Sequence, residues 1–356
     1  MKRFTYVSGI AVSVLVVSLL MVGPSLFADG GANHRVRNLH LGVSGGNIKD
    51  ISRRFCCSGT LGSLVQDTQN VQYILSNNHV LGLAGAATAG DDISQPGLID
   101  NGCQVATVVA DFTVAPALSS GVDCAIAQLR PGLMDGTGFI EDIGTISNVV
   151  KTPTVGLSVA KSGRTTGFTT GTISSTTTTV SVRYPAECGK TSGPSFTFTN
   201  QVVINSSTFS AGGDSGSLIV SNNSCHQPVA LLFAGSSTST IGNPISLVLT
   251  RLSASLGRTV SFVGSTCSAA ANVLADAGGP SNESVEFATA VMRSREKNLM
   301  SRPGVIGVGI GASEDGASDA SIVVYVDVTA AVGPKLPKKI NGVKVRRVFT
   351  EPFVAY

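Results

Sequence analysis

The sequence predicts an all-β double barrel followed by a small α+β module. Glycine accounts for 41 of the 356 residues and charged residues make up only 13%. Short strand-like runs separated by turn residues recur from about residue 45 to residue 263. Many short strands at even spacing, joined by glycine-rich turns, are typical of a sandwich or of paired barrels. Hydrophobic residues reach 42%, which is ample material for the cores of a chain this long.

The strand candidates are short apolar or threonine-rich runs. The clearest are Gly62–Val65, Val71–Ser76, Gln104–Val109, Cys124–Leu129, Leu157–Lys161, Thr179–Tyr184, Phe196–Ile204, Ser217–Ser221 and Pro228–Ala234. The threonine-rich stretch 165–180 is also assigned to strands, because β-branched side chains suit a pleated surface. We place the first barrel at about 45–150 and the second at about 151–265, within one domain spanning 45–267.

Residues 1–28 have the pattern of an export signal. A positively charged start precedes the apolar run Ile10–Val22, and Ala28 supplies a small residue at the cleavage point. An uncleaved membrane anchor is the alternative, but the run is shorter than the about 20 apolar residues that a spanning helix needs. The signal predicts a secreted or periplasmic protein without integral membrane association after cleavage. A polar lead-in segment follows at 29–44.

The charge of the chain gives no reason to expect nucleic acid or an acidic membrane as a partner. The formal net charge is +3, and it falls to +1 when the signal is removed with Lys2 and Arg3. The sequence contains no cluster at metal-ligand spacing and no nucleotide-binding fingerprint ahead of a helix. We therefore expect neither a metal nor another cofactor.

The chain contains seven cysteines, which permit disulfides in an exported protein. Their odd number leaves at least one thiol free or paired with another chain. Cys188 with Cys225 is the candidate bridge, and the remaining connectivity stays open.

The pattern changes after Cys267. We expect a linker at 268–283 and a small α+β module at 284–356, whose helix covers about 284–301. The apolar side of this helix is predicted to contain Phe287, Val291 and Met300. The strand candidates of the module are Val305–Ile310, Ser321–Val328 and Val343–Phe349.

Two features of the module bear on function. Gly307, Gly309 and Gly311 precede no helix, so we expect them to mark a strand end rather than a phosphate cradle. The loop Pro334–Lys339 and the hydrophobic end Phe353–Tyr356 suit docking to a partner, and no string in the module indicates a second enzyme.

Three short strings have the chemistry of nucleophilic catalysis. His79 follows a strand-like run, Asp123 heads an apolar run, and Ser215 lies in the turn Gly212–Ser217. A serine becomes a good nucleophile only when a base accepts its proton and a carboxylate holds that base in one tautomer. The order His, Asp, Ser along the chain matches one of the known orders of such triads.

These strings resemble the trypsin-like serine peptidase family of the chymotrypsin fold, in its bacterial secreted form, over about 45–265. The resemblance implies His79 as general base, Asp123 as its orienting acid and Ser215 as nucleophile. It also implies that the amides of Gly213 and Ser215 form an oxyanion hole, which needs a glycine at the first position.

The resemblance extends to the substrate-binding region. Residues 156–167 resemble the opening of the second barrel, and Leu231–Ser236 resembles the strand that lines the primary pocket. The implied substrate-binding residues are Phe209, Ser210, Phe233, Ala234, Gly235 and Ser236. There are departures from the family: Val80 replaces a half-cystine, and Ala234 stands where a serine often supports the triad acid.

Asp214 needs a positively charged partner, because a buried unpaired carboxylate is costly and would distort the adjacent oxyanion turn. In animal relatives a newly cut amino terminus supplies the charge, but the nearest candidate, Val43, does not follow a basic residue. We therefore expect no zymogen cleavage. Arg164 is the predicted internal partner, because a guanidinium engages a carboxylate through two hydrogen bonds.

The combined pattern predicts a serine endopeptidase that hydrolyses polypeptide substrates through an acyl-enzyme. An esterase would use the same triad and stays open. A non-enzymatic binding protein on a protease-like scaffold is the alternative from another class, although it would be expected to have lost a triad residue.

Overall fold

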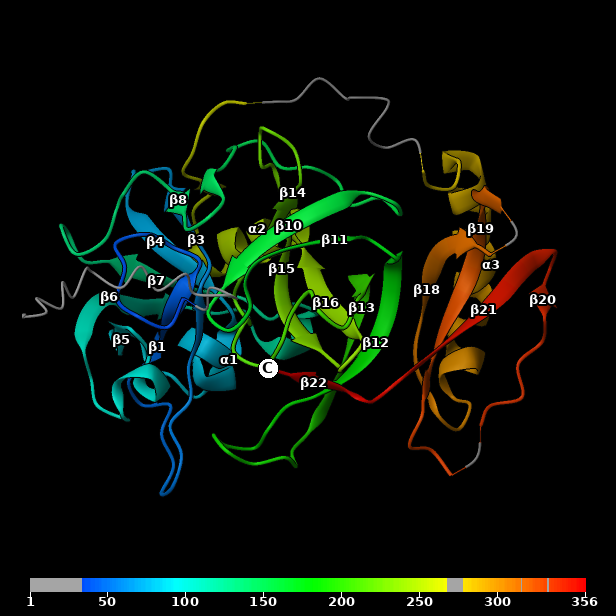
Figure 1. The fold of residues 1–356 in the computed structure, drawn as a ribbon, viewed down its shortest axis with the longest axis horizontal. Helices are drawn as coiled ribbons and strands as arrows, with labels where there is room; N and C mark the ends of the chain where they lie inside the picture. Colours follow the sequence, from blue (N-terminus) through cyan, green and yellow to red (C-terminus); the bar gives the residue numbers. More distant parts are fainter. Residues whose placement is uncertain (1–33, 268–277, 315, 332) are drawn as a thin grey trace, which may run out of the picture. The chain divides into compact units, whose positions relative to one another are not determined.

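The computed structural model describes residues 34–267, 278–314, 316–331 and 333–356 (Figure 1). The predicted export signal lies outside these residues, as do residues 268–277 of the predicted linker. Within the described part of the chain, no helix is long and apolar enough to cross a membrane.

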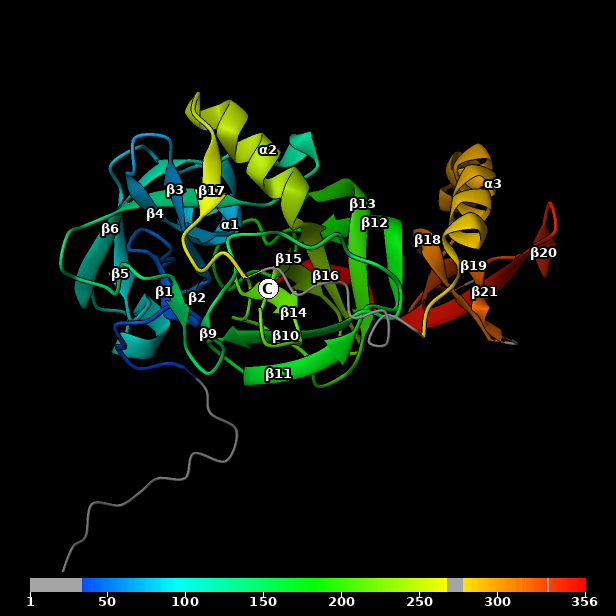
Figure 2. The ribbon, with the colours of Figure 1, turned by 90° about the horizontal axis from the view of Figure 1, so that it is seen from above.

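Eight strands form an antiparallel sheet that surrounds an apolar core. Their order in the sheet is β17 (Val260–Phe262), β3 (Ser63–Asp67), β4 (Gln72–Ser76), β7 (Ala125–Leu129), β6 (Thr107–Val114), β5 (Asp92–Gln95), β1 (Val43–Asn47) and β2 (Gly59–Leu61). Strand β17 comes from far along the chain and pairs with β3 (Figure 2). Fully buried side chains such as Leu64, Ile74 and Ile126 form the core.

A second sheet contains twelve strands. Eleven lie in the order β11 (Gly167–Thr172), β10 (Ser158–Gly163), β14 (Leu218–Ser221), β15 (Pro228–Gly235), β16 (Ser239–Pro244), β13 (Ser195–Asn205), β12 (Ser175–Arg183), β18 (Val305–Ser313), β19 (Gly316–Asp327), β21 (Val343–Thr350) and β20 (Lys339–Ile340). The twelfth strand, β22 (Phe353–Ala355), pairs with β12 and β15, and a separate hairpin is formed by β8 (Phe139–Ile140) and β9 (Gly144–Thr145). These mostly antiparallel sheets confirm the predicted double-barrel fold class.

Strand β18 joins the C-terminal strands to the second sheet by pairing with β12 (Figure 1). The approach is close, because a Cβ added at Gly309 would lie 2.2 Å from Thr178 Oγ1. The prediction that Gly307, Gly309 and Gly311 mark a strand end is wrong: all three lie within β18, where the missing side chains allow the two backbones to approach.

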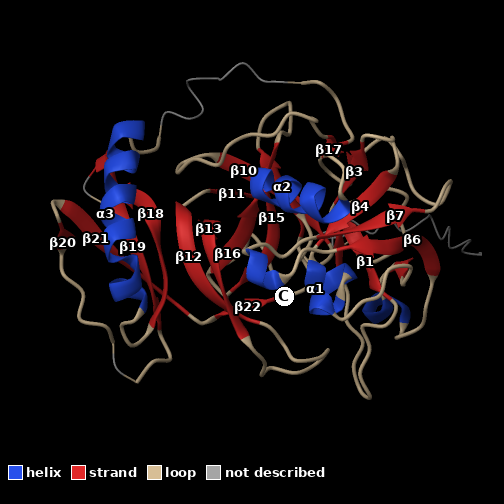
Figure 3. Cartoon of the chain, turned by 180° about the vertical axis from the view of Figure 1, so that it is seen from behind, coloured by secondary structure: helices blue, strands red, loops and turns tan. Residues whose placement is uncertain are grey.

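The helices are short, except for α2 and α3 (Figure 3). They are α1 (Asn78–Leu81), α2 (Ile245–Leu256), α3 (Asn282–Met300) and the 3₁₀ turns η1 (Leu83–Gly85), η2 (Leu98–Asn101) and η3 (Leu118–Ser120). Helix α2 is absent from the sequence-based prediction. Its buried residues Ile245, Val248 and Leu252 have helical spacing, and Gly257 ends it with a φ of +74°.

Helix α3 confirms the helix predicted for the module, and the Ser281 side chain caps it by accepting a hydrogen bond from the Ser284 amide. The expected apolar side is wrong in one respect, because Phe287 is 57% exposed. The buried face is formed by Ala288, Val291, Met292 and Leu299. Phe287 lies beside this stripe instead of within it, since a helix advances by about 100° for each residue.

Three disulfides connect the chain: Cys56–Cys103, Cys57–Cys188 and Cys225–Cys267. The predicted Cys188–Cys225 bridge is wrong. The loop after β12 carries Cys188 to Cys57 near the first sheet, whereas Cys225 lies in the β14–β15 turn, which the segment after β17 reaches. The seventh cysteine, Cys124, is a buried free thiol, as the odd number requires.

Candidate active site

His79 and Asp123 are brought together by the pairing of β4 with β7. The register joins Ser76 to Ala125, so the residues after β4 and before β7 meet at one end of the sheet. The distance from His79 Nδ1 to Asp123 Oδ2 is 2.5 Å, and the His79 amide donates to Oδ1 at 3.2 Å. The carboxylate thus orients the imidazole and leaves Nε2 for another partner.

Asp123 is fully buried and has further hydrogen-bond partners. The Tyr184 hydroxyl donates to Oδ2 at 2.7 Å, the Asn77 amide side chain donates to the Asp123 carbonyl at 2.7 Å, and the Asp123 amide donates to Asn243 at 2.9 Å. Among the described residues, Tyr184 supplies the side-chain hydroxyl that donates to this carboxylate. Burial and the charge of Asp123 raise the pKa of Tyr184 well above its ordinary value, so the hydroxyl stays a donor.

Ser215 lies in the turn between β13 and β14. Gly213 has a φ of +97°, and a Cβ there would lie 2.5 Å from Arg164 Nη1, so this position requires glycine. Thr60 holds the turn: its hydroxyl donates to the Gly213 carbonyl at 2.9 Å and its amide donates to the Ser215 carbonyl at 2.8 Å. The buried Ser215 hydroxyl donates to the Phe233 carbonyl at 3.1 Å.

The partner of His79 Nε2 is the main-chain oxygen of Tyr356, at 3.0 Å. Tyr356 follows β22, and Figure 1 places this end of the chain beside α1. The Tyr356 hydroxyl donates to the Ser236 carbonyl at 2.9 Å. Sequence reasoning assigned this segment to docking and missed its place at His79, because no local pattern relates two residues 277 positions apart.

The residues proposed for substrate binding gather around Tyr356 and Ser215. Ala234 and Gly235 in β15 pair with β22. The Tyr356 side chain packs against the apolar cluster that contains Phe209. The Ser236 carbonyl accepts a hydrogen bond from the Tyr356 hydroxyl, and the Phe233 carbonyl accepts one from Ser215. The Ser210 hydroxyl is hydrogen-bonded to the Thr240 hydroxyl.

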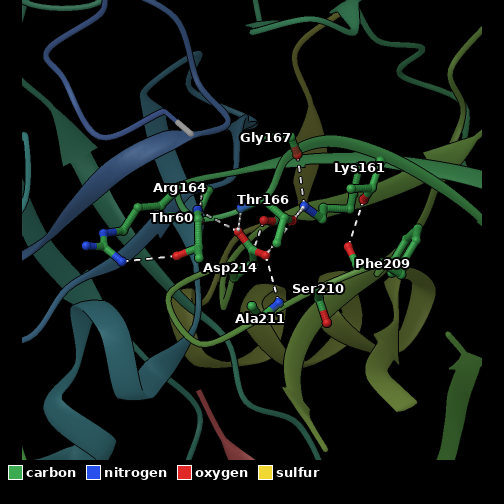
Figure 4. A network of polar contacts seen from close by, with 12 residues as sticks. Thr60, Lys161, Arg164, Thr166, Gly167, Phe209, Ser210, Ala211 and Asp214 are labelled. Carbon is green, nitrogen blue, oxygen red and sulfur yellow. Dashed lines mark hydrogen bonds and ion pairs between the residues drawn. The ribbon is translucent and has the colours of Figure 1, made fainter. Parts of the chain in front are cut away.

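The predicted ion pair between Arg164 and Asp214 is wrong. Arg164 binds Asp100 instead, with Nε and Nη2 at 2.5 and 2.7 Å from the two carboxylate oxygens. The cation beside Asp214 is Lys161, whose Nζ lies 3.5 Å from Oδ2, and both side chains are fully buried. Figure 4 shows the Arg164 side chain extending away from Asp214, while Lys161 approaches it from the other side. Residue 161 lies inside β10, whereas residue 164 lies in the turn beyond it.

Asp214 has a full set of donors besides Lys161 (Figure 4). Oδ1 accepts from the amides of Thr165 and Thr166, and Oδ2 accepts from the Thr166 hydroxyl and the Ala211 amide, at distances of 2.7–3.1 Å. Lys161 also donates to the Thr166 hydroxyl and to the Gly167 carbonyl. This network anchors the turn that carries Ser215.

Two pKa shifts follow from these contacts. Burial alone would lower the pKa of His79, but the charge and hydrogen bond of Asp123, with the Tyr356 oxygen, raise it above the ordinary value. Burial lowers the pKa of Lys161 to about 8, against the opposing effect of Asp214. His79 is therefore held toward its protonated form, and Lys161 titrates within an accessible pH range.

A cavity of about 430 Å³ lies beside His79, Gly213 and Tyr356. The Cys57–Cys188 disulfide borders it, as does Asp50, whose pKa is raised to about 6 by burial. Asp50, Cys57 and Cys188 are close enough to surround an ion, but the two sulfurs are bonded to each other and cannot act as thiolate ligands.

No protein family model and no curated protein matches this sequence. Several solved structures are similar in fold. A glutamic-acid-specific serine protease has 20% identity, with a TM-score of 0.43 over 62% of this chain and 98% of its own. Thermobifida fusca protease A has 18% identity and a TM-score of 0.41, over 64% of this chain and 98% of its own. The chymotrypsin of Cellulomonas bogoriensis has 15% identity and a TM-score of 0.41 over 64% and 99%.

Proposed function

We propose that the chain is a serine endopeptidase in which His79, Asp123 and Ser215 form the catalytic triad. The observation that carries the proposal is the buried, oriented His79–Asp123 pair from the first sheet, whose histidine lines the same cavity as Gly213 in the turn of Ser215. An esterase acting through the same groups is the second candidate, because the triad and turn are suited to acyl transfer in general.

In the proposed reaction the Ser215 hydroxyl leaves the Phe233 carbonyl by rotating about its side-chain bond and attacks the substrate carbonyl. His79 Nε2 accepts the hydroxyl proton and then donates it to the leaving amine, and water releases the acyl group by the reverse sequence. The amides of Gly213 and Ser215 stabilise the oxyanion. In the described part of the chain, neither amide donates to a protein acceptor, which leaves both for this role.

The proposal includes the compartment and the division of the chain. Three disulfides favour an oxidising, secreted or periplasmic location. The peptidase domain is proposed to span 45–267, with 284–356 as a further module that joins the second sheet through β18 and β22.

Labelling with a fluorophosphonate tests the proposed function. The wild-type chain and a Tyr356→Gly variant, which lacks the phenol side chain that binds the Ser236 carbonyl, are treated with the probe, and the adduct is located by peptide mapping. We expect the adduct on Ser215, with faster labelling in the variant. The absence of label from both proteins would favour a binding protein. Comparison of matched peptide and ester substrates separates a peptidase from an esterase.

The activity should depend on pH through two groups. General-base catalysis requires neutral His79, and its pKa is raised, so the rate should increase with pH with an apparent pKa above the free imidazole value of about 6.5. The rate should decrease again near pH 8, where Lys161 loses the charge that balances Asp214. Initial rates from pH 5 to 10 measure both limbs. A rate that does not increase between pH 5 and pH 8 would contradict the role of His79 as general base. A rate that stays level from pH 8 to pH 10 would contradict the role of Lys161.

A further inference from the structure

We propose that Phe353–Tyr356 occupies the cleft as the acyl part of a peptide substrate would, and that the enzyme therefore prefers a tyrosine immediately before the cleaved bond. The inference rests on the proposed function and adds a substrate class to it. It is carried by the backbone pairing of the segment, by the position of the Tyr356 main-chain oxygen and by the surroundings of the phenol ring.

The backbone of the segment is bound as an added strand. Strand β22 pairs in antiparallel fashion with β15, joining Ala355 to Ala234 and Val354 to Gly235. It also pairs in parallel fashion with β12, joining Phe353 to Val182. Main-chain pairing of this kind binds any extended peptide, and selectivity then comes from the pockets that receive its side chains.

Tyr356 lies at the groups that carry out the proposed chemistry. The Tyr356 main-chain oxygen is 3.0 Å from His79 Nε2, and the Ser215 side chain is fully buried. Tyr356 therefore stands where the residue before the cleaved bond would stand. The 430 Å³ cavity beside His79 and Gly213 provides space for the leaving part of a substrate.

The pocket that receives the phenol ring has apolar walls and a polar end. The ring packs against the cluster of Phe209, and its hydroxyl donates to the Ser236 carbonyl at 2.9 Å. A Cβ added at Gly235 would lie 2.1 Å from that hydroxyl, so the pocket reaches this depth because residue 235 is glycine. A phenylalanine would fill the walls but leave the carbonyl without its donor.

The charges near the pocket disfavour an acidic side chain. Burial raises the pKa of Tyr356 to about 12, and the negative charge of Asp214 adds to this rise. Lys161, the cation that balances Asp214, is already engaged with Thr166 and Gly167. A glutamate in this pocket would bring a second carboxylate to a buried site without a free cation among the described residues that line it.

The same segment competes with substrates, because it belongs to the chain and is present at a high effective concentration. A substrate must displace β22 from β15 before it can pair there. Weakening the hold of Tyr356 should therefore increase the rate on peptides without changing the order of preference among them.

The experiment uses fluorogenic peptides acetyl-Phe-Val-Ala-X-aminocoumarin, in which X is Tyr, Phe, Glu, Lys or Gly. They are assayed with the full chain and with Tyr356→Gly and Tyr356→Phe, and Phe349→Ser serves as the control because Phe349 is 62% exposed in β21. For Tyr we expect kcat/KM about 10-fold above Phe and about 100-fold above Glu, consistent with the loss of one hydrogen bond and with burial of an unpaired charge. Tyr356→Gly should raise kcat/KM several-fold, Tyr356→Phe less, and Phe349→Ser should have no effect.

Fluorophosphonate labelling of the same proteins tests the proposed peptidase function separately from the proposed tyrosine preference. Proteins that label at Ser215 but cleave the Phe, Glu or Lys peptides as fast as the Tyr peptide would overturn the tyrosine preference and leave the peptidase. Selectivity for Tyr without any gain in either Tyr356 variant would overturn the competition. If no protein labels or cleaves, the function itself is wrong and the inference with it.

Discussion

Ser215→Ala should lower kcat by about 10⁶-fold while the protein remains folded. The hydroxyl is the nucleophile of the proposed reaction, and a methyl group cannot form an acyl-enzyme. The structural cost should be small, since the only side-chain hydrogen bond lost among the described residues is that to the Phe233 carbonyl. The measurement is the hydrolysis of the Tyr peptide in a Tyr356→Gly background, where the cleft is most accessible.

Ser207→Ala is the matched control, because Ser207 is an exposed serine close in the sequence to the same turn. It should keep full activity and full labelling. A Ser215→Ala protein with activity within tenfold of its parent would contradict the triad, as would labelling by the fluorophosphonate at another site with the same rate.

Lys161→Met should destabilise the protein by about 3–5 kcal/mol and abolish labelling of Ser215, because it leaves Asp214 buried without its cation. The carboxylate ties the residues before Ser215 to the turn between β10 and β11, since it accepts hydrogen bonds from Ala211 and from Thr165 and Thr166. Loss of its charge balance should therefore disturb the oxyanion turn as well as the fold. Chemical denaturation and labelling of the same sample measure the two effects.

Two variants make this result specific. Lys190→Met removes an exposed lysine whose only ion pair among the described residues is with exposed Glu187, and it should change neither stability nor labelling. Adding Asp214→Asn to Lys161→Met removes both buried charges and should recover part of the stability. If Lys161→Met is as stable as the wild type, Asp214 does not depend on this lysine.

The sequence predicted correctly the features that depend on residues close together along the chain. Strand periodicity and glycine turns predicted the double barrel, and the strings around His79, Asp123 and Ser215 singled out residues of which the first two are in contact. Helix α2 was missed because only strand-like runs were expected up to residue 263, although the spacing of Ile245, Val248 and Leu252 is helical. Which face of a segment is buried depends on what packs against it, and the sequence does not show the packing partner. Phe287 was therefore assigned to the buried face of its helix although it is exposed.

The missed groups of the candidate site come from far along the chain. Tyr184 reaches Asp123 across 61 residues, and Tyr356 reaches His79 across 277. Neither residue stands in a motif, so only the paired strands reveal them. The need of Asp214 for an internal cation was derived from the cost of a buried charge. The assignment of Arg164 was wrong because the cation of Asp214 depends on which residue of β10 and its turn points inward, and that residue is Lys161.

The pairing of β18 with β12 also has a consequence for solubility. Without the C-terminal strands, β12 would border the sheet with unpaired N–H and C=O groups along much of Ser175–Arg183. Its β-branched composition and length are those of an exposed edge strand, which acts as a template for pairing between molecules. In the intact chain β18 covers that edge. The C-terminal strands therefore protect the second sheet against self-association, whatever else they bind.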